Sequence, residues 1–120
     1  MVGLSASPMR PSHSVSAYMQ AKGYKIIPVN PRIAEALGEK SYPSLLEMPL
    51  EVAQTIDLVD VFRRSEYVDE IVEQAIRLKI PVIWLQEDVI NEVAAEKARQ
   101  AGMFVVMDRC ILKEHRARFG

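Results

Sequence analysis

Serine, proline and arginine residues fill one turn near the start of the chain, from Ser5 to Ser12. The turn follows a short apolar run and precedes a helix-like stretch over 13–22. A helix N-terminus has unpaired N–H groups and about half a positive charge, so it readily binds phosphate. We therefore predict that this turn binds a phosphate group, with Ser12 capping the helix through its hydroxyl.

Arginines also gather where the predicted strands end. The chain has 15 lysines and arginines against 16 acidic residues, so a local group of arginines is informative. Parallel sheets bind ligands beyond the carboxyl ends of their strands, and this grouping predicts a ligand with several phosphate charges. The alternative is that exposed strand ends simply tolerate arginine. The arginines are Arg10, Arg32, Arg63, Arg64 and Arg109.

The end of the second predicted strand indicates which nucleotide is bound. NAD sites place an acidic residue here for the ribose hydroxyls, whereas this chain has Asn30, Pro31 and Arg32. An arginine attracts a ribose phosphate, so coenzyme A and NADP both qualify. Only Gly3 of the three glycines in a dinucleotide fingerprint is present, which counts against NADP.

Strands and helices alternate along the rest of the chain. We predict strands at 2–4, 24–29, 56–62, 82–85 and 103–107, and helices over 13–22, from Ser65 onward, and from Asn91 or Asp88 to Gln100. Residues 33–50 are expected to be irregular apart from one helical turn at 44–47, and the chain is expected to end in a short basic tail. Apolar strands of this kind predict an α/β, Rossmann-like, open and mostly parallel five-stranded sheet with helices on both faces.

Composition limits the class of protein. With 120 residues, 49% of them apolar, the chain is expected to form a single domain over 1–120. A net charge of −1 argues against nucleic-acid and membrane-surface partners. The single cysteine favours a reducing compartment, and no apolar run is long enough to span a membrane, so we expect a cytoplasmic protein.

Blocks along nearly the whole chain resemble the small CoA-binding protein family, whose fold is similar to the CoA-binding domain of the succinyl-CoA ligase alpha subunit. The blocks that carry the resemblance are Val2-Gly3-Leu4-Ser5, Arg10-Pro11-Ser12, Ile27-Pro28-Val29-Asn30-Pro31, Asp60-Val61-Phe62-Arg63, Trp84-Leu85-Gln86, Asn91-Glu92-x-Ala94-Ala95, Ala101-Gly102 and Val105-Val106-Met107-Asp108-Arg109-Cys110.

This resemblance implies a non-catalytic protein that binds CoA or acyl-CoA across the strand ends. The chain departs from the family in two places. Members usually begin with a helix and a longer first strand, so the first strand of this chain is expected to be truncated at the N-terminus. In addition, Glu87 and Asp88 follow Gln86, where the family has a glycine shortly after the glutamine. The residues that the resemblance places around CoA are Gly3, Ser5, Arg10, Ser12, Asn30, Pro31, Arg32, Phe62, Arg63 and Gln86.

Other functions stay open at this point. Cys110 is either a thiol close to the pantetheine sulfur, as in an NADP- or CoA-disulfide-linked redox protein, or a small buried residue. A docking subunit of a larger acyl-CoA ligase is a further alternative. Asp60 is expected either at the ligand edge, ordering Arg63, or as a surface or capped aspartate. We predict no catalytic motif and no metal site, and the oligomeric state is not predicted.

Overall fold

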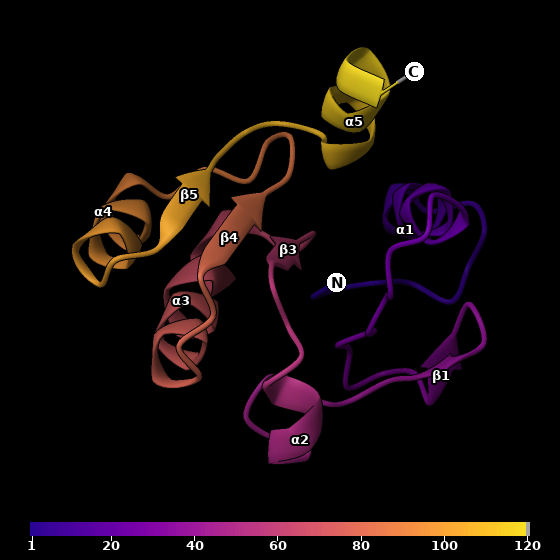
Figure 1. The fold of residues 1–120 in the computed structure, drawn as a ribbon, viewed down its shortest axis with the longest axis horizontal. Coiled ribbons are helices and arrows are strands. Elements are labelled where there is room, and N and C mark those ends of the chain that lie inside the picture. The colour runs from indigo at the N-terminus through magenta and orange to yellow at the C-terminus, as the bar shows by residue number, and fades with distance from the viewer. Residues whose placement is uncertain (120) are drawn as a thin grey trace.

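The computed structural model describes residues 1–119 (Figure 1). It contains five α-helices, one 3₁₀ helix and two small sheets. In chain order these are α1 (Pro11–Ala21), β1 (Glu35–Ala36), β2 (Glu39–Lys40), α2 (Leu50–Ala53), β3 (Val59–Val61), η1 (Ser65–Tyr67), α3 (Val68–Arg77), β4 (Val82–Leu85), α4 (Glu92–Gln100), β5 (Phe104–Val106) and α5 (Ile111–Phe119).

The central sheet is parallel and has three strands in the order β3-β4-β5. The predicted five-stranded sheet is therefore wrong in its strand count. The two N-terminal segments reach the sheet only through single parallel bridges, from Val2 to both Val29 and Val61. Gly3 has φ +89°, which ends regular pairing after Val2, and Pro28 has no N–H to donate.

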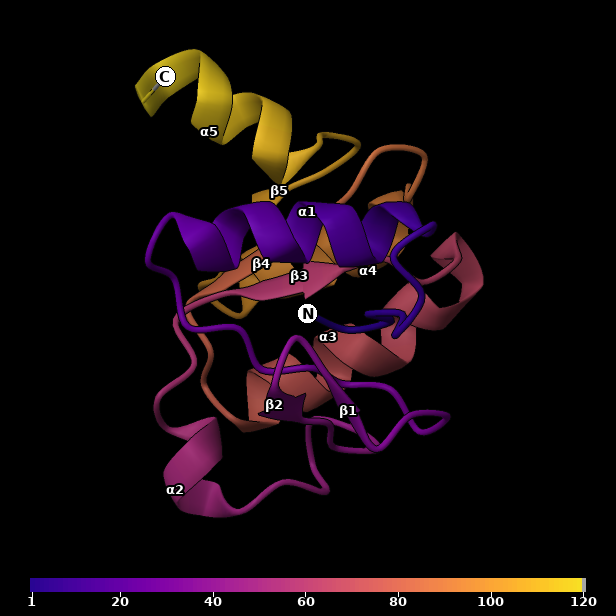
Figure 2. The same ribbon diagram turned by 90° about the vertical axis from the view of Figure 1, so that its right-hand side faces the viewer.

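Helices cover both faces of the central sheet, as predicted. α3 and α4 pack together on one face, and α1 and α5 contact each other on the other (Figures 1 and 2). Along β4, Ile83 and Leu85 point toward α3 and α4 and are fully buried, whereas Val82 and Trp84 are only half-buried. The α3/α4 face is therefore the better covered of the two.

The helices begin and end for local reasons. α1 starts with Pro11 at its first position and stops before Gly23, whose φ is +97°. The predicted cap by Ser12 is wrong, because Arg10 occupies the N-cap position and no side chain caps it. In α4 the predicted Asn91 cap is confirmed, since its side chain accepts a hydrogen bond from the backbone N–H of Ala94 at 3.0 Å.

The predicted helix at Ser65 begins as the 3₁₀ turn η1 and becomes α-helical at Val68. Ser65 does not cap it; its hydroxyl accepts a hydrogen bond from the N–H of Ile90 at 2.9 Å. The apolar stripe is confirmed. Four of its members are buried and two are half-buried: Val68, Ile71, Val72 and Ala75, then Ile76 and Leu78.

Two regions contain elements that the sequence did not predict. Residues 44–47 form a hydrogen-bonded turn where one helical turn was predicted, but the hairpin β1-β2 and the short helix α2, which were not predicted, lie on either side of it. The expected basic tail is the helix α5, which starts at Ile111 directly after the buried Cys110. Within residues 1–119 no helix is long and apolar enough to cross a membrane.

Candidate functional site

Serine hydroxyls fold the first turn onto the N-terminus of α1. The N–H of Ser5 donates to Oγ of Ser12, and the N–H of Ser7 donates to Oγ of Ser5, both at 3.0 Å. The N–H of Arg10 then donates to the carbonyl of Ser7 at 3.1 Å. Ser12 is buried, so the bond from Ser5 is shielded from water and fixes the turn against the helix.

The N-terminus of α1 differs electrostatically from the other helix N-termini. Its first turn contains no acidic residue and no side-chain cap. The other four α-helices each have acidic side chains there, namely Glu51, Asp69 with Glu70, Glu92, and Glu114. A helix N-terminus attracts negative charge. Of the five α-helices in residues 1–119, only α1 has no acidic side chain in its first turn to provide that charge.

Asn30 connects the second predicted strand end to the first turn. Its Nδ2 donates to the carbonyl of Leu4 at 3.0 Å, and its Oδ1 accepts from the N–H of Arg32 at 2.9 Å. Its carbonyl accepts from the hydroxyl of Ser41 at 3.1 Å. This network fixes the backbone of Arg32 beside the first turn, and the Arg32 side chain is exposed.

Gly3 and Arg63 connect the third strand end to the first turn. A Cβ built on Gly3 would lie 3.1 Å from Cδ of Arg63, so the arginine stem runs directly over the glycine. The guanidinium of Arg63 sits 4.2 Å from the ring centroid of Tyr67, a cation–π contact. Arg63 is half-buried, and its position is therefore defined at both ends of the side chain.

Within the described chain, two of the five arginines predicted at the strand ends form ion pairs, and three do not. Arg64 pairs with Glu66 at 3.9 Å, and Arg109 pairs with Glu114 at 3.2 Å. The other three form no ion pair with any acidic residue among residues 1–119: Arg10, Arg32 and Arg63. The three without an acidic partner are the ones that were predicted to contact the ligand.

Three other predicted site residues have structural contacts in the fold. The buried Gln86 accepts a hydrogen bond at Oε1 from the N–H of Ile111 at 3.1 Å, which fixes the start of α5. Cys110 is 9% exposed and belongs to the apolar cluster under α1. Phe62 is half-buried against the same cluster. Their contacts with a ligand stay predictions, as do those of Pro31, which is exposed.

Of the acidic pair after β4, Glu87 has a basic partner, and Asp88 makes its contact through the backbone. Both carboxylate oxygens of Glu87 accept from Nζ of Lys113 at 3.1 Å, and this contact raises the pKa of the lysine. The N–H of Asp88 donates to the Asp108 carboxylate at 2.8 Å. The carboxylate of Glu87 is thus held by α5. In the described part of the chain no group of acidic, histidine or cysteine residues is arranged to bind a metal.

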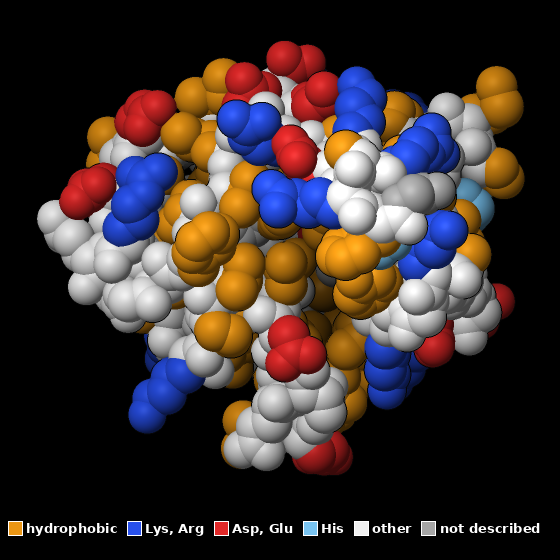
Figure 3. Space-filling model, turned by 45° about the horizontal axis from the view of Figure 1, so that its top comes forward, with side chains coloured by type: hydrophobic (Ala, Val, Ile, Leu, Met, Phe, Trp, Pro, Cys, Tyr) orange, Lys and Arg blue, Asp and Glu red, His pale blue; other side chains and the backbone are white. Residues whose placement is uncertain are grey.

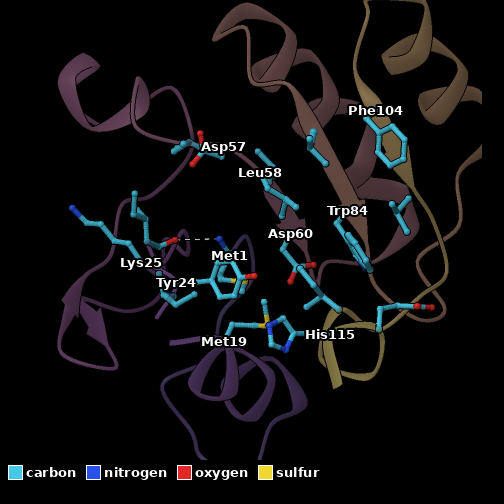
Figure 4. A pocket seen from close by; sticks show the side chains of 18 of the residues that line it. Met1, Met19, Tyr24, Lys25, Asp57, Leu58, Asp60, Trp84, Phe104 and His115 are labelled. Carbon is cyan, nitrogen blue, oxygen red and sulfur yellow. Dashed lines mark hydrogen bonds between the residues drawn. The ribbon is translucent and has the colours of Figure 1, made fainter. Parts of the chain in front are cut away.

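A large cavity that the sequence analysis missed opens on the α1/α5 face of the sheet. Its volume is about 990 Å³, and Met19, Leu58, Trp84 and Phe104 line it together with the N-terminal Met1 (Figure 4). In the space-filling view hydrophobic side chains surround a hollow, with lysines and arginines at its margin (Figure 3). The predicted ligand residues from Gly3 to Gln86 do not line this cavity.

Asp60 lies at the inner wall of the cavity, between Met1 and Trp84 (Figure 4). It is 1% exposed, and neither carboxylate oxygen has a hydrogen-bond partner among residues 1–119. Burial raises its pKa to about 7, although the buried amine of Met1 and the neighbouring backbone N–H of Val61 oppose the shift. The expectation of a surface or capped aspartate is wrong, and no hydrogen bond or ion pair joins Asp60 to Arg63 among residues 1–119. Whether Asp60 lies at the ligand edge stays a prediction. The signal was present in the sequence as one acidic residue inside the apolar run 56–62.

Comparison with known proteins identifies related chains. The sequence matches the family described as "CoA binding domain" over residues 1–116. It is 46% identical over 115 residues to the uncharacterized protein YneT of Bacillus subtilis, a match that covers 96% of this chain and 82% of YneT.

Solved structures show the same fold. A hypothetical protein from Pyrococcus horikoshii superposes with a TM-score of 0.92 at 39% identity, covering 99% of this chain and 81% of that one. A protein from Thermus thermophilus gives a TM-score of 0.88 at 35% identity, covering 98% of this chain and 87% of that one.

Proposed function

Because the chain belongs to the CoA-binding domain family, we propose that residues 1–120 form one domain that binds coenzyme A across the carboxyl ends of its strands. One observation supports this most directly. The serine-bonded first turn lies on a helix N-terminus without acidic residues, and three arginines beside the strand ends form no ion pair with acidic residues among residues 1–119. Phosphates are the groups that such an arrangement binds.

Each phosphate of coenzyme A has a candidate partner. The diphosphate lies over the turn from Ser5 to Ser12, where the N-terminus of α1 and Arg10 attract it. Arg32 binds the ribose 3′-phosphate from the backbone position that Asn30 fixes. Arg63 reaches the ligand above Gly3, where the missing side chain lets the arginine approach the backbone. The Asn30-Pro31 turn and Phe62 border the adenosine.

The rest of coenzyme A is bound without a reaction in this proposal. Gln86 and Cys110 flank the start of α5, on the side where the pantetheine arm leaves the diphosphate. Cys110 is buried among apolar residues, which favours a packing role over disulfide exchange with the ligand. No observation favours the redox enzyme or the ligase subunit over a CoA-binding protein.

Calorimetric titration of the purified protein with coenzyme A, dephospho-CoA and NADPH tests the proposal. We expect coenzyme A to bind most tightly. Arg32→Glu should weaken coenzyme A about tenfold or more and dephospho-CoA much less, because a bond between charged groups contributes roughly 1.5–3 kcal/mol.

Arg64→Glu is the matched control, because Arg64 is also exposed at a strand end but is already paired with Glu66. It should leave both affinities close to those of the wild type. If Arg32→Glu lost the same affinity for coenzyme A and for dephospho-CoA, Arg32 would not be the partner of the ribose 3′-phosphate. Tighter binding of NADPH than of coenzyme A would contradict the proposed function itself.

A further inference from the structure

Tyr67 is an aromatic residue whose position the packing of the core does not explain. It lies in the 3₁₀ turn η1, shortly after the end of β3, and it is 41% exposed. In the part of the chain that the structure describes, it belongs to neither of the two apolar core clusters. A large ring that remains exposed contributes little buried apolar area, so its role must come from another contact.

That contact is with Arg63. The guanidinium carbon of Arg63 lies 4.2 Å from the ring centroid of Tyr67, well inside the roughly 6 Å over which an aromatic ring attracts a cation. Further back along the same side chain, Cδ of Arg63 lies 3.1 Å from the place where a Cβ on Gly3 would stand. With no acidic partner for Arg63 among residues 1–119, the ring of Tyr67 is the contact that fixes the charged end of this side chain.

The turn that carries Tyr67 is itself held in place by hydrogen bonds. The N–H of Tyr67 donates to the carbonyl of Arg64 at 3.0 Å and closes the 3₁₀ turn. Ser65, at the start of the turn, accepts from the N–H of Ile90 through its hydroxyl at 2.9 Å and from Nδ2 of Asn91 through its carbonyl at 3.2 Å. The ring of Tyr67 is therefore presented from a backbone that is attached to the loop before α4.

We propose that Tyr67 is a positioning residue of the coenzyme A site, a role that rests on the proposed function: its ring holds the side chain of Arg63 across Gly3 before coenzyme A binds. Ordering a free arginine side chain on binding costs conformational entropy, and a side chain that is already ordered avoids that cost. The ring contacts only part of the guanidinium, whose five N–H donors leave others for a phosphate. Tyr67 acts through Arg63 and does not touch the ligand.

Calorimetric titration with coenzyme A measures the effect. Tyr67→Leu removes the ring and should weaken coenzyme A about two- to fivefold, the range that an exposed cation–π contact supports. Tyr67→Phe keeps the ring and should bind as tightly as the wild type. Tyr24→Leu is the matched control, because Tyr24 is 48% exposed but its ring contacts His115 rather than a predicted ligand arginine; it should leave the affinity unchanged.

The variant Arg63→Ala separates positioning from direct contact with the ligand. If Tyr67 acts through Arg63, adding Tyr67→Leu to Arg63→Ala should weaken coenzyme A no further, and a double-mutant cycle should assign the whole effect of Tyr67→Leu to the pair. A tyrosine that touched the ligand itself would cause the same loss in both backgrounds, which would contradict the positioning role.

Proton NMR of the free protein tests the contact without coenzyme A. The ring current of Tyr67 should move the δ protons of Arg63 upfield in the wild type and in Tyr67→Phe, and this shift should be lost in Tyr67→Leu. Wild-type δ protons without an upfield shift would overturn the proposal, whatever the affinity for coenzyme A.

The titrations distinguish failure of this role from failure of the proposed function. If Arg63→Ala weakens coenzyme A but Tyr67→Leu binds it as tightly as the wild type or more tightly, the positioning role is wrong and the proposed function stands. If the wild type does not bind coenzyme A at all, the proposed function is wrong and the role of Tyr67 is wrong with it.

Discussion

Replacing Asp60 by asparagine is expected to change how the stability of the protein depends on pH. Burial raises the pKa of the Asp60 carboxyl from 3.8 to about 7 in the folded protein. The folded state therefore holds this proton more tightly than the unfolded chain does. The stabilisation that results is fully present below about pH 4 and is lost as the pH rises through 7. Asparagine has nearly the same shape and does not titrate.

The size of the effect follows from the pKa shift. Each unit of difference contributes about 1.4 kcal/mol, and the folded carboxyl is only half ionised at pH 7. Between pH 5 and pH 7 the wild type should therefore lose roughly 2 kcal/mol of unfolding free energy through Asp60. Above pH 7 the loss levels off. The difference in unfolding free energy between Asp60→Asn and the wild type should thus grow by roughly 3 kcal/mol from pH 5 to pH 9, in favour of the variant.

The two pH values also remove the influence of the buried Met1 amine. Burial lowers the pKa of this amine below 8.0, so it is neutral at pH 9 in both proteins. At pH 5 the amine faces an uncharged side chain in both proteins, because Asp60 is then protonated. The other ionisable side chains that line the cavity, such as His115 and Lys25, are present in both proteins.

Urea unfolding followed by the fluorescence of Trp84 at pH 5, 7 and 9 measures the difference, provided that the two proteins share one m-value. Asp57→Asn is the control. Asp57 lines the same cavity but is exposed, so its variant should follow the wild-type dependence on pH. If the stability difference between Asp60→Asn and the wild type is constant from pH 5 to pH 9, the reasoning about Asp60 is refuted.

Three substitutions test the first turn by calorimetry with coenzyme A and by urea unfolding. Ser12→Ala removes the acceptor of the Ser5 N–H and should destabilise the protein by about 1 kcal/mol and weaken coenzyme A; an unchanged affinity would separate the turn from the ligand. Asn30→Ala removes two bonds of the network that positions the ligand arginine, and should weaken coenzyme A more than it lowers stability. Gly3→Ala and Gly38→Ala both strain a positive φ, by about 1 kcal/mol, but only Gly3→Ala pushes against a neighbouring side chain, Arg63. Only Gly3→Ala should therefore weaken coenzyme A, and equal affinities for the two variants would contradict the placement of Arg63.

Local signals were sufficient for the elements on the well-covered face. The apolar stripe of α3 and the Asn91 cap of α4 both lie within a few residues of the helices that they define, and β4 was predicted with its observed bounds. α5 was missed because only Ile111 in it is buried, so the segment has no apolar stripe to read. The prediction of the first two strands was wrong for a different reason. The first segment pairs only at Val2, next to Gly3, and the second has Pro28 beside Val29, so it lacks an N–H to donate there. The positive φ of Gly3 is not visible in an apolar run.

The candidate site was predictable in part. A turn of small residues before a helix, with arginines at successive strand ends, gave the first turn and Arg32 without knowledge of the fold. The partners of Ser12 and Gln86 could not be read in the same way. Ser12 accepts from Ser5 across the turn rather than capping its own helix, and Gln86 accepts from a residue 25 positions away. Hydrogen bonds between distant segments depend on the tertiary structure, which residue spacing does not contain.

Asp60 is held inside the sheet by the strand that carries it. Its neighbours Val59 and Val61 are fully buried and hold the strand in register with β4, so the carboxylate cannot reach solvent by a local shift. A buried carboxylate without a hydrogen-bond partner is unfavourable when it is ionised, so the wild type should lose unfolding free energy as the pH rises through 7, and Asp60→Asn should not.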